Sequence, residues 1–153
     1  MMNEKMNRKE ERELALRGIF QIDFHEENGE LGESITSFLE NAGDGDPEDE
    51  VHGESNGYAK EAIDAAVEHH KEIDDMISHY LKEDWDFSRI PKTEKAILRL
   101  GITELLYIGI PKEIAIDQAL ELAKRYGSDE SKTYINGILN NVAVDHFEEL
   151  SKD

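Results

Sequence analysis

The pattern of apolar positions between residues 92 and 108 predicts a central helix that is enclosed by its neighbours. The apolar side chains cover most of the circumference of such a helix: Ala96, Ile97, Leu98, Leu100, Ile102, Leu105 and Leu106. A helix that is apolar on most sides is buried, whereas a surface helix shows one apolar stripe. The polar residues recur at spacings of three and four and predict one exposed seam: Lys92, Lys95, Arg99 and Thr103. Gly101 weakens a helix by roughly 1 kcal/mol relative to Ala, so we expect a second helix to approach closely there.

The residues that follow predict two more helices. Gly109 can end the central helix, and Pro111 suits the start of the next one. That helix has an apolar face as far as Gly127: Ile114, Ala115, Ala119, Leu122, Ala123 and Tyr126. Ser128 is a natural N-cap for the last helix, whose apolar side chains are Tyr134, Ile135, Ile138, Leu139 and Val142. Because the residues around Gly137 have helical spacing, we interpret it as a packing glycine rather than part of a hairpin turn.

The first half of the chain is also helical in pattern, with one interruption. We predict an amphipathic helix over Arg8–His25, a short helix over 31–39, and further helices over 58–70 and 73–81. Residues 40–55 contain seven acidic side chains, three glycines, one proline and no basic residue. Such a segment cannot bury enough apolar surface to order itself, so we expect a mobile loop. The prediction is therefore an all-α fold of about seven helices.

Four segments resemble the NusB family of bacterial transcription antitermination factors. They are ERELALRGIFQID at 11–23, EKAILR at 94–99, IDQALELAK at 116–124 and YINGIL at 134–139. Together they cover roughly residues 8–26 and 85–142, in the order and spacing of the family. The resemblance implies a single NusB-like domain over residues 1–153. It would consist of two small packed helical bundles, about 8–84 and about 85–149.

Charge and composition limit the kind of partner the chain can bind. The 153 residues carry a net charge of −19 and contain no cysteine, which excludes disulfides and thiolate sites. No apolar run is long enough for a transmembrane helix and no signal-peptide core is visible, so we expect a cytoplasmic protein without a membrane partner. The net charge alone argues against nucleic acid. However, residues 1–17 hold five basic side chains, whereas residues 18–59 hold none.

The first candidate site is a basic arm formed by Arg8, Lys9 and Arg12. The resemblance implies that these residues occupy the position of an arginine-rich motif that contacts RNA phosphates, which fixes register without reading bases. The alternative is an ordinary solvated helix end. Glu10 and Glu11 depart from the family pattern and would weaken the attraction for RNA.

The second candidate lies at the start of the last helix, where Lys132 and Tyr134 stand beside a helix N-terminus. The N–H groups of such a terminus can bind anions, and an exposed aromatic ring can stack on an unpaired base. The resemblance implies that the aromatic residue lies near RNA. Helical periodicity alone favours the alternative, in which Tyr134 belongs to the core. Thr133 departs from a basic residue found in some relatives, and Lys132 could substitute for it.

The third candidate is a protein interface. The resemblance implies that Phe20, Glu94 and Glu130 hold NusE, a ribosomal protein that also acts as a transcription factor. Because NusE is basic, acidic contacts would be complementary and would steer association. The alternative is ordinary surface charge for the two glutamates and a core position for Phe20.

Patterns for catalysis, cofactors and metals are absent from the sequence. The histidines at 69, 70 and 79 do not converge on one helix face, and residues 44–55 lack the glycine and the bidentate glutamate of a calcium loop. We therefore expect a non-enzymatic adaptor without a cofactor. It would pair with NusE, bind the single-stranded boxA element of nascent ribosomal RNA leaders and join the RNA polymerase antitermination complex.

Two alternatives to the adaptor remain open. A NusB-like domain also accompanies ribosomal RNA cytosine methyltransferases, although that function would need a separate catalytic chain here. The chain could also be a self-associating helical bundle that hides its RNA face. The sequence does not decide between a monomer and a homodimer.

Overall fold

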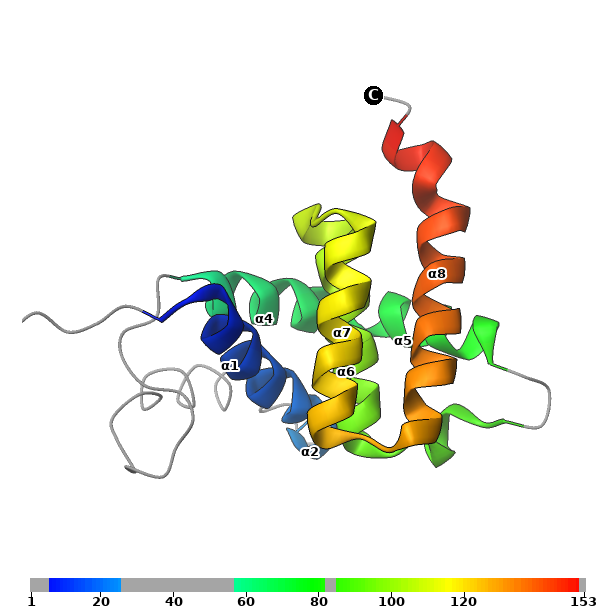
Figure 1. The fold of residues 1–153 in the computed structure, drawn as a ribbon, viewed down its shortest axis with the longest axis horizontal. Coiled ribbons are helices and arrows are strands. Elements are labelled where there is room, and N and C mark those ends of the chain that lie inside the picture. The colour runs from blue at the N-terminus through cyan, green and yellow to red at the C-terminus, as the bar shows by residue number, and fades with distance from the viewer. Residues whose placement is uncertain (1–5, 26–56, 82–84, 152–153) are drawn as a thin grey trace, which may run out of the picture. The chain divides into compact units, whose positions relative to one another are not determined.

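The described part of the chain is built of helices. The computed structural model describes residues 6–25, 57–81 and 85–151, and no strand occurs among them. Its α-helices are α1 (Arg8–Phe20), α2 (Ile22–His25), α4 (Tyr58–Glu68), α5 (His70–Tyr80), α6 (Lys92–Thr103), α7 (Lys112–Tyr126) and α8 (Asp129–Ser151) (Figure 1). A 3₁₀ turn at Phe87–Arg89 precedes α6, and a π-helical segment at Glu104–Ile108 follows it. The all-α prediction is confirmed. The helix predicted over 31–39 and the acidic loop 40–55 lie outside the described residues.

Internal contacts divide the chain into two units, Met1–Glu68 and His69–Asp153. The second unit begins at His69 and therefore includes α5, which the sequence analysis grouped with the first bundle. In the first unit α1 packs against α4. The two helices approach so closely that a Cβ added at Gly18 would lie 2.3 Å from Cδ1 of Ile63. A larger residue at position 18 would therefore force the Ile63 side chain, or the two helices, to shift.

Of the predicted exposed seam on α6, only Lys92 is exposed, whereas Lys95, Arg99 and Thr103 are buried, so the prediction is wrong for most of the helix. In the second unit α6 packs against α5, α7 and α8. The Arg99 side chain is only 2% exposed, and its guanidinium donates two hydrogen bonds of 2.8 Å to the Asp74 carboxylate on α5. The Thr103 hydroxyl donates to the Arg99 carbonyl at 2.7 Å, and the Lys95 ammonium lies 4.5 Å from the ring centroid of Phe87. Spacing alone does not distinguish a solvated polar stripe from a buried one whose groups are paired.

The glycines around α6 behave largely as predicted. A Cβ on Gly101 would lie 2.9 and 3.0 Å from the two terminal methyl carbons of Leu139, which confirms the close approach of a second helix, α8. Gly109 has the left-handed φ of +86° and ends the π-helical segment. The backbone N–H groups of Gly109 and Ile110 both donate to the Glu104 carbonyl at 2.9 Å. Pro111 stands immediately before the first residue of α7, as expected.

The pairing of Arg99 with Asp74 predicts a large asymmetry between neighbouring acids on α5. Asp74→Ala should lower the free energy of unfolding by roughly 3 kcal/mol, because it leaves a buried guanidinium without this carboxylate. Asp75→Ala, at the next and exposed position, should change it by less than about 0.5 kcal/mol. Urea titrations followed by circular dichroism measure both. Similar small effects would mean that the ion pair does not hold α5 on α6.

Candidate functional site

The predicted basic arm is only partly presented to solvent. Arg8 and Lys9 are exposed in the first turn of α1, whereas Arg12 is buried, with 7% of its surface accessible. The Arg8 guanidinium lies 3.7 Å from the ring centroid of Tyr58, the first residue of α4. Such a contact fixes the position of a cation without neutralising its charge. The arm therefore offers two accessible cations, held at the paired N-termini of α1 and α4.

The two acids within the arm have structural roles that the sequence analysis missed. Glu10 completes a capping box with Asn7: the Glu10 N–H donates to the Asn7 side chain at 2.9 Å, and the Asn7 N–H donates to the Glu10 carboxylate at 3.2 Å. Glu11 is fully buried, and its carboxylate accepts the backbone N–H of Ala59 at 3.0 Å. It thereby caps the N-terminus of α4, where a negative charge is favourable. Glu11 is therefore needed for the packing of α1 against α4, and its carboxylate faces the first turn of α4.

A reciprocal serine pair defines the start of α8. The Ser131 N–H donates to the Ser128 hydroxyl at 3.2 Å, and the Ser128 N–H donates to the Ser131 hydroxyl at 2.9 Å. The predicted N-cap role of Ser128 is thus confirmed. Lys132, which is partly exposed, and Tyr134 follow in the first turns of this helix.

Tyr134 is fixed at the surface through a contact with α6. It is partly exposed, and its hydroxyl donates a short hydrogen bond to the carboxylate of Glu94. Burial, together with the adjacent carboxylate, raises the pKa of the Tyr134 hydroxyl far above its ordinary range, so the group stays protonated and remains a donor. Glu94 is itself only 5% exposed. Glu94, which was predicted to contact NusE at the surface, is therefore buried. There it accepts a hydrogen bond from Tyr134, the residue predicted to contact RNA.

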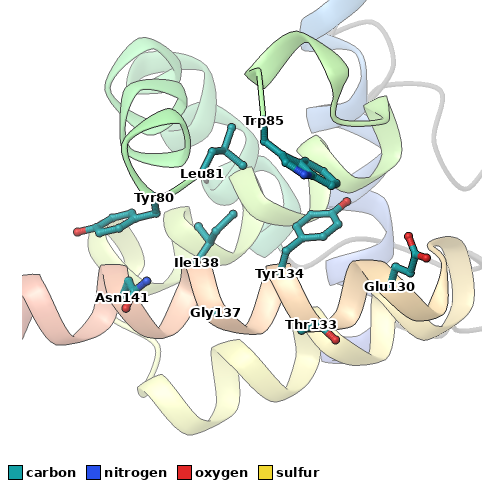
Figure 2. A pocket seen from close by; sticks show the side chains of 9 residues that line it. All are labelled: Tyr80, Leu81, Trp85, Glu130, Thr133, Tyr134, Gly137, Ile138 and Asn141. Carbon is teal, nitrogen blue, oxygen red and sulfur yellow. The ribbon is translucent and has the colours of Figure 1, made fainter. Parts of the chain in front are cut away.

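Beside Tyr134 lies an open groove of about 500 Å³. Its lining residues are Tyr80, Leu81, Trp85, Glu130, Thr133, Tyr134, Gly137, Ile138 and Asn141 (Figure 2). A Cβ added at Gly137 would meet nothing within 4 Å. The prediction of a packing glycine is therefore wrong at this position: the missing side chain leaves the groove open instead of admitting another helix.

Trp85 is the functional candidate that sequence reasoning overlooked. A tryptophan in the connector before α6 would ordinarily anchor it in the core, yet 45% of the surface of Trp85 is exposed. Its ring lies 5.4 Å from the Tyr134 ring, centroid to centroid, at an interplanar angle of 51°. The signal available in the sequence was a single tryptophan placed between two aspartates, a polar setting that is unusual for a core anchor.

The residues predicted to contact NusE have different environments. Phe20 is the last residue of α1 and is partly exposed. Glu130 is exposed in the first turn of α8 and reaches the groove. Glu94, as described above, is buried under Tyr134. Phe20 and Glu130 are thus accessible to a partner, whereas Glu94 is not and could affect a partner only by positioning Tyr134.

The described residues show neither a metal-binding cluster nor a membrane-spanning helix. Across 6–25, 57–81 and 85–151, no group of three or more His, Asp or Glu side chains is arranged to hold a metal ion. No helix within these ranges combines the length and the apolar character needed to cross a membrane.

Comparisons with known proteins agree with the sequence motifs. The profile of the NusB family matches residues 9–144. The transcription antitermination protein NusB of Geotalea uraniireducens is 37% identical over 139 residues, which cover 90% of this chain and 94% of that protein. The structure of T. maritima NusB superposes with a TM-score of 0.74 at 33% identity and covers 94% of both chains.

A second solved structure is described as antitermination factors NusB and NusE in complex with double-stranded RNA. It matches with a TM-score of 0.68 at 27% identity, covering 90% of this chain and 96% of that one. The motifs, the helical fold and these similarities extend over nearly the whole chain. The chain therefore belongs to the NusB family.

Proposed function

We propose that this chain is a non-enzymatic, RNA-binding transcription antitermination factor that pairs with NusE and binds boxA in nascent ribosomal RNA leaders. The observation that carries the proposal is the fold that the chain shares with a NusB protein solved together with NusE and RNA. The exposed cations Arg8 and Lys9 and the partly exposed ring of Tyr134 supply the two kinds of contact that such binding needs. Phosphate contacts position the RNA, and aromatic contacts hold unpaired bases.

The charge distribution explains why a partner would be needed. Because Arg12 is buried, the arm contributes about two phosphate contacts, which correspond to a log-log salt slope of about −1.4 on single strands. A net charge of −19 opposes RNA at longer range. NusE, as a basic protein, would add cationic surface and turn a weak site into a composite one. In this view Arg12 supports the arm from within, and Lys132 adds a further cation beside Tyr134.

The proposed NusE surface is carried by Phe20 and Glu130, which are accessible. Glu94 cannot reach a partner directly unless its carboxylate releases the Tyr134 hydroxyl. We therefore assign Glu94 a positioning role for Tyr134. The acidic contact to a basic partner falls to Glu130, where charge complementarity would accelerate association.

Neutralising the arm should weaken RNA binding in a salt-dependent way. The double variant Arg8→Gln/Lys9→Gln should bind boxA RNA less tightly and flatten the salt slope by about 1.4, because two phosphate contacts are lost. The matched control Lys60→Gln/Lys71→Gln removes the same charge from exposed positions outside the arm and should change the slope little. Fluorescence anisotropy of labelled RNA at several salt concentrations, with NusE present, measures both. Equal slopes for the two double variants would exclude the arm.

NusE should raise the affinity of the chain for boxA RNA at least about tenfold. This corresponds to a coupling free energy of about 1.4 kcal/mol, and thermodynamic linkage requires RNA to raise the affinity for NusE by the same factor. Titrating RNA with and without NusE, and NusE with and without RNA, gives both factors. Independent binding of the two partners would refute the composite site, and gel filtration of the free chain would show whether self-association hides it.

Removing the Tyr134 ring should weaken RNA binding by a different route. Tyr134→Ala removes a stacking surface but no charge, so affinity should fall while the salt slope stays that of the wild type. Tyr134→Phe keeps the ring and removes the donor to Glu94, so it should lower stability by about 1–3 kcal/mol and preserve more of the RNA affinity. Anisotropy and urea titrations separate these effects. A flattened slope for Tyr134→Ala would instead place Tyr134 among the phosphate contacts.

A further inference from the structure

The groove beside Tyr134 has the size and the walls of a binding site. Its volume of about 500 Å³ lies within the range of about 300–1,000 Å³ that is typical of small-molecule sites. Leu81 and Ile138 provide apolar lining, and Gly137 leaves the space above α8 unfilled (Figure 2). All of these residues belong to the second unit of the chain.

The aromatic residues of the groove are held in place before any ligand arrives. The Tyr134 hydroxyl is tied to Glu94, and the Tyr80 hydroxyl donates a short hydrogen bond to Asp145. Burial, reinforced by Asp145, raises the pKa of Tyr80 to about 12, so this donor is also retained at neutral pH. Trp85 packs against the edge of this arrangement while nearly half of its surface stays exposed. Fixed rings of this kind bind a planar ligand without a large loss of side-chain entropy.

The polar groups of the groove favour a neutral base over a phosphate. Glu130 is one of the lining residues, and its negative charge would repel a phosphate. Thr133 and Asn141 are also among the lining residues. Together they offer hydrogen-bond donors and acceptors to the edge of a base. Lys132 lies between Glu130 and Thr133 in the sequence, so a cation is available nearby for the backbone of the same strand.

We propose that this groove receives one unpaired base of the bound RNA and that Trp85 forms a stacking surface for it, together with Tyr134. The inference rests on the proposed RNA-binding function, which it deepens by naming the part of the RNA that enters the groove. Phosphates would be held outside the groove, at Lys132 and at the arm. Base stacking is tolerant of sequence because every base has a π-face, so the groove fixes the path of the strand more than its sequence.

Trp85 is the only tryptophan in the chain, so its fluorescence reports directly on this groove. Single-stranded RNA carrying boxA should quench that fluorescence, in the presence of a tryptophan-free NusE. Oligonucleotides of the same length with one abasic position at a time should identify the base whose removal abolishes the quenching. An RNA held only through its phosphates would bind with the tryptophan signal unchanged.

Two variants test the groove, one by removing a lining ring and the other by filling the space. Trp85→Ala removes the stacking surface and should weaken RNA binding at least about fivefold, with an unchanged salt slope. Gly137→Leu fills the groove and should weaken binding similarly, although it improves helix propensity and meets no neighbour within 4 Å at its Cβ. Tyr126→Ala is the matched control, because Tyr126 is another exposed aromatic residue of the second unit that does not line the groove.

The outcomes separate this inference from the proposed function. If wild-type chain and NusE bind no boxA RNA, both fail. If RNA binds through the arm but Trp85→Ala and Gly137→Leu bind it as the wild type does, the groove does not hold a base and the adaptor function stands. Loss of NusE binding in these variants, with RNA affinity retained, would assign the groove to a protein segment and overturn the inference.

Discussion

The burial of α6 on all sides from Glu94 to Thr103 is the constraint on which the second unit depends. The Arg99–Asp74 ion pair ties α6 to α5, and the absence of a side chain at Gly101 lets α8 approach from another direction. These contacts set where Glu94, in the first turn of α6, meets Tyr134 on α8. The shape of the candidate groove at the surface is thus determined by the packing of the core beneath it. A weak contact between α6 and α8 would leave Tyr134 without a fixed orientation.

The sequence predicts most of the fold because its signals are local. Apolar spacing located the helices, and the serine, proline and glycine residues at their ends marked several boundaries correctly. Two inferences failed because they depend on contacts between distant residues. The seam containing Arg99 looked exposed, since spacing cannot reveal a partner such as Asp74 on another helix. Gly137 looked like Gly101, although only one of the two faces a neighbouring helix.

The candidate site was less predictable than the fold for the same reason. Arg8 and Lys9 are exposed, as their position at the start of a helix suggests, but the burial of Arg12 and Glu94 depends on packing. The sequence also could not show that Tyr134 and Glu94, proposed for different partners, share a hydrogen bond. Trp85 was missed because a tryptophan in a connector is ordinarily an anchor. Its exposure depends on how it packs against Tyr134 of α8, which the sequence does not show.

The capping acids of α1 restrict how this protein can evolve a stronger hold on RNA. Removing a negative charge next to Arg8 and Lys9 is the simplest way to strengthen phosphate contacts, but the two available acids are not equivalent. Glutamine can replace Glu10 within a capping box, so this substitution should change the free energy of unfolding little. Glu11 is buried against the first turn of α4, and losing it would uncap that helix at a cost of about 0.5–2 kcal/mol. Selection for tighter RNA binding can therefore replace Glu10 with little loss of stability, whereas replacing Glu11 would destabilise the fold.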